Sequence, residues 1–208
     1  MTSNLLILAH SGRMLAASAR RAGYVPLVVD RFADLDTRRL AGDCIRVADF
    51  RPRAVLAAAL NLIGRHQPLG WVYGAGVDAM PDLVQRLSSL CPLFGNDAAV
   101  VRRCVDPRQF FALLDHLGIP YPPTRWEPPT TSGWLYKEGG CGGMGVRMWR
   151  GGRQPGSGYF QRRMPGPVFT LAFLADGERL CWHGFNTLYH RPYNDCLPFL
   201  FAGAVNRG

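Results

Sequence analysis

Residues 134–149 read WLYKEGGCGGMGVRMW, a run in which glycines separate two short segments rich in aromatic and aliphatic residues. The glycines satisfy the pattern GxGxxG over residues 140–145. In a dinucleotide-binding loop a helix follows that pattern at once, whereas VRMW reads as a strand. The P-loop is excluded because GK[ST] is absent. We interpret the stretch as a glycine-rich turn between antiparallel strands, whose backbone N–H groups can approach a phosphate closely.

The only lysine of the chain, Lys137, lies just before these glycines, while the remaining basic residues (24 − 1 = 23) are all arginine. Alternation along the strand places Leu135 and Lys137 on one face and Trp134, Tyr136 and Glu138 on the other. A lysine ammonium is a compact charge on a flexible stem, and the planar fork of arginine does not replace it beside a phosphate. The pattern favours Lys137 as a phosphate ligand, with a solvated strand residue as the alternative.

The composition is that of a globular protein with an anionic partner. The chain has 208 residues, 48% of them hydrophobic, and a formal charge of +9. The basic residues are scattered, which disfavours nucleic acid and favours a nucleotide or a small anionic metabolite. The six cysteines show no CxxC spacing, and no apolar run approaches the roughly 20 residues of a membrane span. The N-terminus reads as a first strand rather than a signal peptide, so we expect a cytoplasmic protein with reduced thiols.

The first half of the chain alternates strand and helix signals. Continuous apolar runs at 4–9 and 25–30 are typical of buried parallel strands, and shorter strands are expected at 70–76 and 92–97. Helical segments are expected between them, up to Arg21, over 52–64 and over 80–90. Repeated βα units predict a Rossmann-like or flavodoxin-like parallel sheet covered by helices.

Ligands of such sheets bind at the carboxyl ends of the strands. The residues that follow the predicted strands are Ser11, Gly12, Arg13, Asp30, Gly76 and Asp78. We take them as candidate substrate contacts, and ordinary turn residues are the alternative.

The character of the chain changes after Asn96. Asp106, Pro107 and Gln109 have the spacing of a capping box and predict a helix that ends at Gly118. The segment IPYPPTRWEPPTTSG that follows cannot continue a helix. Later segments are strand-like, at 134–138, 145–149, 159–163, 168–175 and 178–188.

A hairpin turn is predicted at Asp176-Gly177, between the last two of these strands. The sequence therefore predicts two domains: a Rossmann-like domain over 1–97 and a mainly antiparallel α+β domain over 98–208.

Three motifs in succession resemble the ATP-grasp superfamily. GND at 95–97 with VVRRCVDPRQFFALLDHLGIPYPPT resembles the family's lead-in helix and its GIP-x-P turn. WLYKEGGCGGMGV resembles the strand lysine and phosphate flap, and GYFQRRMPGPVFTLAFLADG resembles the strands and hinge that clamp the adenine. The resemblance covers most of the chain and implies a Rossmann-like domain followed by a partial, mostly antiparallel ATP-grasp domain.

The resemblance also assigns roles to residues. It makes Lys137 the lysine that contacts the nucleotide phosphates and residues 139–145 the flap over them. The flap residues are Gly139, Gly140, Gly142, Gly143, Met144 and Gly145. Gln161, Arg162, Arg163 and Met164 would form the hinge, whose backbone hydrogen-bonds the adenine edge while Met164 packs near the base. A plain edge strand over 159–163 is the alternative.

The chain departs from the family pattern in three places. Arg108 stands near the position of a second family lysine, and Arg162 and Arg163 stand where an acidic residue often contacts the ribose. Family catalysis also uses late carboxylates and an asparagine to hold Mg²⁺, but after Glu178 the only acid is Asp195. We therefore expect ATP as cofactor, and Mg²⁺ only if a further C-terminal segment exists. The sequence is then either a truncated form of a longer protein or a chain that binds nucleotide poorly and catalyses nothing.

Two functions from different classes remain open. The first is an ATP-dependent carboxylate–amine (or thiol) ligase that works through an acyl phosphate, with Ser11, Arg13, Asp78 and Arg191 as candidate substrate contacts. The second is a non-catalytic module of this fold that binds a nucleotide or a partner. A dinucleotide-dependent oxidoreductase is disfavoured because HSGR at 10–13 lacks GxGxxG. An exposed edge strand in an incomplete domain also predicts a homodimer.

Overall fold

The computed structural model describes residues 3–138, 144–193 and 198–207, and within strand β10 it leaves the side chains of residues 182 and 183 undescribed. The chain forms two compact units, Met1–His116 and Leu117–Gly208, which are treated separately. The domain boundary expected after residue 97 stays a prediction.

The first unit is built on a four-stranded parallel sheet with strand order β3-β2-β1-β4. The strands are β1 (Asn4–Ala9), β2 (Val25–Asp30), β3 (Asp43–Arg46) and β4 (Gly70–Tyr73). The helices are α1 (Arg13–Arg21), α2 (Leu35–Leu40), α3 (Pro52–His66), α4 (Pro81–Ser88), α5 (Ala98–Val105) and α6 (Pro107–His116).

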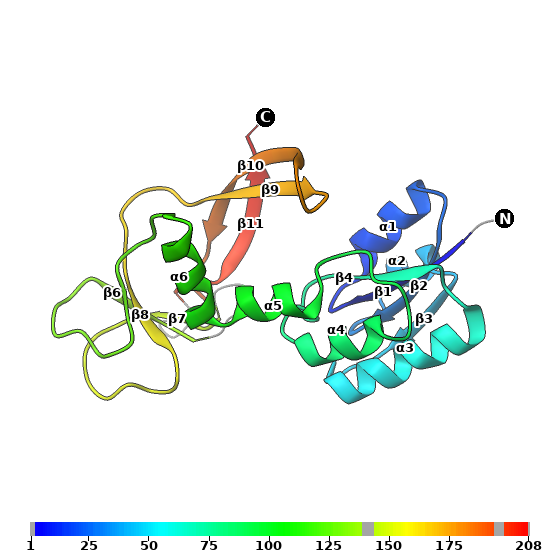
Figure 1. Ribbon diagram of the computed structural model, residues 1–208, viewed down its shortest axis with the longest axis horizontal. Coiled ribbons are helices and arrows are strands. Elements are labelled where there is room, and N and C mark those ends of the chain that lie inside the picture. Colours follow the sequence, from blue (N-terminus) through cyan, green and yellow to red (C-terminus); the bar gives the residue numbers. More distant parts are fainter. Residues whose placement is uncertain (1–2, 139–143, 194–197, 208) are drawn as a thin grey trace. The chain divides into compact units, whose positions relative to one another are not determined.

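Helices cover both faces of this sheet, so β1 and β2 are apolar on both sides (Figure 1). On one face Ala16 and Ala19 of α1 pack against Ile7 and Val28. On the other face α3 and α4 bury a larger cluster around the fully buried Trp71. The continuous apolar runs therefore form the centre of the core, as the sequence predicts.

The predicted strand at 92–97 is wrong in extent. Within the described residues, this segment makes a single parallel bridge, between Leu93 and Trp71. Pro92 has no N–H to donate to a ladder, and the chain then turns so that Asp97 can cap α5 by accepting a hydrogen bond from the N–H of Val100 at 2.9 Å. Strand β3 and helix α2 are additions that the sequence patterns did not reveal, because both are short and polar.

The second unit contains two antiparallel sheets. One has the order β5-β8-β6-β7 and the other the order β11-β10-β9. The strands are β5 (Thr124–Arg125), β6 (Trp134–Lys137), β7 (Val146–Met148), β8 (Tyr159–Arg162), β9 (Phe169–Ala175), β10 (Leu180–His190) and β11 (Phe201–Asn206). The predicted fold class, a parallel α/β sheet followed by a mainly antiparallel part, is confirmed.

Two local predictions are confirmed by hydrogen bonds. The Asp176 carboxylate accepts the backbone N–H groups of Glu178 and Arg179 in the turn that joins β9 to β10. At the start of α6, Asp106 accepts the backbone N–H of Gln109 and also its side-chain amide. Both bonds run from Gln109 to the Asp106 carboxylate, so the N-cap forms as the spacing predicts, but the return bond of a full capping box does not: the Asp106 N–H donates to the Arg102 carbonyl.

Candidate functional site

The register of β6 against β8 brings two polar side chains together. Leu135 is paired with Gln161 and Lys137 with Tyr159, so Lys137 and Gln161 lie diagonally on one face of the sheet. Lys137 Nζ donates a hydrogen bond to Gln161 Oε1 at 2.7 Å. Sequence reasoning had placed Lys137 on this face, but the interaction with Gln161 emerges only from the pairing of the strands.

The opposite face of these strands is anchored by aromatic packing. Tyr136 and Phe160 are fully buried, their rings 5.3 Å apart, and Trp149 meets Phe160 edge-on at 4.8 Å. The Tyr136 hydroxyl donates to the Glu138 carboxylate and accepts the backbone N–H of Gly158, both at 3.0 Å. The ring packing and the hydrogen bonds on the opposite face therefore fix the backbone that carries Lys137.

The two ends of the predicted phosphate flap (residues 139–145) are hydrogen-bonded to each other. The backbone N–H of Glu138 donates to the Gly145 carbonyl at 2.9 Å, directly beyond the last pair of β6 and β7. Met144 is exposed. The remaining flap residues, Gly139, Gly140, Gly142 and Gly143, lie outside the described residues. The described ends thus confirm a hairpin-like connection between antiparallel strands, while the role of the flap stays a prediction.

Burial affects the pKa of the Lys137 amine. The side chain is partly buried, and desolvation lowers the pKa of its amine below the ordinary lysine value of 10.5. Among the described residues the partly desolvated ammonium has one hydrogen-bond acceptor, Gln161 Oε1, and an ammonium carries two further N–H donors. An anion with several oxygens can satisfy those donors and replace some of the solvation that burial removes.

The predicted hinge is divided between a strand and the segment after it. Gln161 and Arg162 belong to β8, and Gln161 is buried. The backbone N–H of Arg162 donates to the Pro123 carbonyl and that of Arg163 to the Gly133 carbonyl, so both are already used within the unit. Met164 follows the strand with an exposed side chain.

The side chain of Arg162 is also occupied. Its guanidinium donates to the Ser132 carbonyl at 2.9 Å and lies over the Trp134 ring. The alternative, a plain edge strand over 159–163, is wrong, because β8 lies between β5 and β6.

In the first unit, the end of β2 faces the turn after β1. Asp30 is fully buried, and its Oδ2 accepts the backbone N–H of Gly12 at 2.6 Å. Its Oδ1 accepts the N–H groups of Phe32 and Ala33, both at 2.7 Å. A Cβ at Gly12 would come within 2.6 Å of Val28, so only glycine allows this close approach. Asp30 is therefore a structural acceptor for three backbone donors.

Of the other candidates at this edge, Ser11, Arg13 and Asp78 are exposed and Gly76 is buried. Asp78 accepts the backbone N–H of Gly76 at 2.7 Å and so stabilises a turn. Ser11 is exposed, and Arg13 forms a 3.7 Å ion pair with Asp36 on the surface. Sequence reasoning missed His10, whose ring lies so close to Gly76 that a Cβ there would approach it within 2.5 Å. No local pattern marks this contact.

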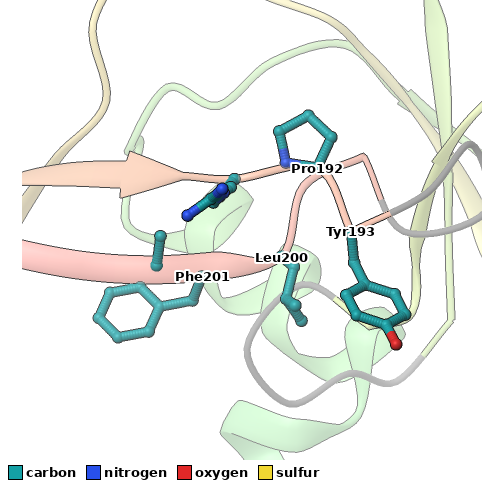
Figure 2. Close-up of a pocket in the computed structure, with 6 residues that line it drawn as sticks. Pro192, Tyr193, Leu200 and Phe201 are labelled. Carbon is teal, nitrogen blue, oxygen red and sulfur yellow. The ribbon is translucent and has the colours of Figure 1, made fainter.

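Arg191, the remaining substrate candidate, lines a cavity of about 410 Å³ between the end of β10 and the start of β11. The lining residues are Arg191, Pro192, Tyr193, Leu200, Phe201 and Ala202. In Figure 2 the side chains of Tyr193 and Leu200 extend to the side of the chain opposite Pro192. The backbone N–H of Arg191 donates to the Leu200 carbonyl at 2.9 Å, which closes the end of the hairpin.

Arg108, the expected substitute for a second family lysine, lies in the first turn of α6, where its backbone N–H donates to the Asp106 carboxylate at 2.8 Å. Among the described residues, no three His, Cys, Asp or Glu side chains come together as a metal site. In the same part of the chain, none of the helices has the length and apolar character of a membrane span.

Known proteins resemble this chain in structure but not detectably in sequence. No family model matches it, and neither does any curated protein. N5-Carboxyaminoimidazole synthetase from Staphylococcus aureus, solved with ADP, superposes with a TM-score of 0.69 at 16% identity, covering 96% of this chain and 57% of that chain. The L-amino acid ligase from Bacillus licheniformis gives a TM-score of 0.66 at 14% identity, covering 92% and 52%.

A biotin carboxylase domain of a single-chain bacterial carboxylase gives a TM-score of 0.61 at 16% identity, covering 91% of this chain and 51% of that chain. The chain therefore spans a little over half the length of the solved structures that it matches. These proteins belong to the superfamily that the motifs resemble. The chain has the ATP-grasp fold over the part of those proteins to which it corresponds.

Proposed function

We propose that the chain binds ATP, with Lys137 and the flap (residues 139–145) on the phosphates and the segment that follows β8 on the adenine. The observation that carries the proposal is the position of Lys137. Its ammonium is partly buried on a rigid strand, at the base of a glycine-rich connection whose two ends are joined at Glu138 and Gly145. The structural neighbour from Staphylococcus aureus was solved with ADP, which supports a nucleotide as ligand.

For the adenine, the proposal relies on backbone groups after β8. The backbone N–H groups of Arg162 and Arg163 are engaged, so the N–H of Met164 is the first in the hinge that could meet a base without breaking one of these bonds. Its exposed thioether is flexible and polarisable, and such a side chain packs well against an aromatic ring.

For the complete protein, we propose an ATP-dependent ligase. ATP would phosphorylate a small carboxylate, and an amine or thiol would displace phosphate from the acyl phosphate. The three neighbours described above are a synthetase, a ligase and a carboxylase domain, which supports this reaction type without naming a substrate. The described residues offer no cluster of metal ligands, so we assign no Mg²⁺ ligand to this chain and derive no step through the metal.

The binding proposal is tested by isothermal titration of the wild-type chain and of Lys137→Met with Mg-ATP, Mg-ADP and NAD. Losing a charged hydrogen-bond donor costs about 1.5–3 kcal/mol, so the affinity of Lys137→Met for ATP should fall by about tenfold to a hundredfold. Arg153→Met is the matched control, because it removes one exposed positive charge from the same unit and should change the affinity by less than about twofold. Equal affinity of wild type and Lys137→Met would contradict the site, and tighter binding of NAD than ATP would contradict the ligand.

The ligase proposal is tested separately, by measuring ADP release from Mg-ATP in the presence of a panel of small carboxylates and amines. ADP release that depends on both substrates supports a ligase. ATP binding without turnover on the longest natural form of the protein would instead favour the non-catalytic binding module.

A further inference from the structure

We propose that Gln161 and Thr124 position Lys137 through a series of directed hydrogen bonds that ends on a neutral acceptor for the ammonium. The inference concerns the lysine of the proposed ATP site, and its functional meaning rests on that proposal. Three adjacent strands each supply one member: Thr124 lies on β5, Gln161 on β8 and Lys137 on β6.

The direction of each hydrogen bond follows from the groups at the two ends of the series, the Pro122 carbonyl and the Lys137 ammonium. Thr124 Oγ1 lies 2.9 Å from the Pro122 carbonyl oxygen, which can only accept, so the hydroxyl donates its one proton there. The hydroxyl can then only accept from Gln161 Nε2, which lies 3.0 Å away. The carbonyl end of the same amide is thereby turned towards Lys137 Nζ, at 2.7 Å. The ammonium can only donate, so both ends of the series impose the same orientation on the amide.

The members of this series have little freedom to rearrange. Gln161 is buried, and its strand lies between β5 and β6. Thr124 is paired directly with Gln161 across the β5–β8 ladder, and Leu135 is paired with Gln161 across the β6–β8 ladder. Side chains that are fixed by their neighbours on regular elements hold a functional group more closely than loop residues do.

The chemical identity of Gln161 matters because it is a neutral acceptor. A carboxylate at this position would form an ion pair with the ammonium and offset its charge before any phosphate arrived. The amide instead accepts one N–H and leaves the full positive charge available to an anionic ligand. Burial lowers the pKa of the Lys137 amine, and a neutral partner does not reverse that effect as a carboxylate would.

The test uses the fact that Lys137 is the only lysine, so isotope-labelled lysine yields a single side-chain signal in an NMR titration. No nucleotide is present in this measurement. In Gln161→Glu the pKa of Lys137 should rise by about one unit or more, because an opposite charge within a few ångströms favours the ammonium. Gln154→Glu is the control: it makes the same charge change in the same unit, but the Gln154 side chain is bonded to the Gly158 carbonyl, and its effect should be smaller.

The orienting role of Thr124 is tested with Thr124→Val, which removes the hydroxyl at nearly constant shape, and with Thr124→Ser, which keeps it. Thr124→Ser should titrate like wild type, while Thr124→Val should shift the Lys137 signal and its pKa. If both variants titrate like wild type, Thr124 does not orient the amide. If Gln161→Glu and Gln154→Glu give the same pKa, Gln161 does not contact the lysine.

Two further measurements keep the outcome decisive. In the unmodified chain, nuclear Overhauser contacts between the side chains of Lys137 and Gln161 should be present whether or not any variant folds, and their absence would overturn the proposal. ATP titration of Gln161→Glu should show a loss of affinity of about tenfold. If the Lys137 pKa responds to the variants as expected but the chain does not bind ATP, the positioning stands and the proposed function is refuted. If the chain binds ATP but the Lys137 pKa does not respond to the variants, the positioning alone is refuted.

Discussion

Replacing Asp30 by asparagine should destabilise the first unit, because one oxygen of the buried carboxylate has no substitute in the amide. An Asn side chain can keep one oxygen where Oδ1 accepts Phe32 and Ala33. Its NH₂ group then replaces Oδ2 and faces the N–H of Gly12, where the present bond is 2.6 Å long. Two donors would oppose each other in a site with no access to water, since Asp30 is fully buried.

The magnitude follows from the bond that is lost. A hydrogen bond to a charged acceptor contributes about 1.5–3 kcal/mol, and an unsatisfied buried donor adds to that loss, so we expect a decrease of about 2–4 kcal/mol in the free energy of unfolding. With a urea m-value of about 2 kcal/mol/M, the middle of the usual range, the midpoint should fall by about 1–2 M.

The matched control is Asp34→Asn. Asp34 caps α2, where its carboxylate accepts the Thr37 N–H at 2.8 Å, and asparagine is as good an N-cap residue as aspartate. The same chemical change should therefore cost less than about 0.5 kcal/mol there. All the described helices lie within Met1–His116, so the helical circular dichroism signal reports the unfolding of this unit. Equal urea midpoints for the two variants would refute the structural role of Asp30.

Three further predictions concern other parts of the chain. Tyr136→Phe removes the hydroxyl that joins Glu138 to the Gly158 N–H and should lower the stability of the second unit by about 1–2 kcal/mol. Urea unfolding followed by tryptophan fluorescence measures this loss, and an unchanged midpoint would contradict the two hydrogen bonds of the hydroxyl. Because burial lowers the pKa of Lys137, the lysine charge and the affinity for ATP should decline, as the pH rises, already below pH 10.5, the ordinary pKa of lysine. Calorimetry that shows a constant affinity for ATP up to pH 10.5 would contradict this prediction. Burial, followed by the charge of Asp30, raises the pKa of the Cys44 thiol to about 11, so iodoacetamide at mildly alkaline pH should modify the exposed Cys181 well before Cys44. An unfolded cysteine thiol ionises near its ordinary pKa of 9.0, so the stabilisation from Cys44 is complete below that pH and should decline towards pH 11. Cys44→Ala should remove this pH dependence.

Local sequence patterns were sufficient for the elements whose formation depends on neighbouring residues. The apolar runs at 4–9 and 25–30 became β1 and β2 because a strand covered by helices on both faces needs apolar residues at every position. The Asp106 cap and the Asp176 turn form from bonds that span three residues or fewer. Alternation within β6 was likewise enough to place Lys137 on the face opposite Tyr136.

The tertiary structure alone decided the contacts of the candidate site. Lys137 and Gln161 are 24 residues apart, and only the register of β6 on β8 places them within a hydrogen bond of each other. The bond from Gly12 to Asp30 spans 18 residues and depends on the packing of β1 beside β2. The physical reason is that a strand's own sequence determines which side chains share a face, whereas the identity of their partners depends on which strand pairs with it and in what register. The sequence thus identified the lysine, and the sheet determined the neutral amide that holds it.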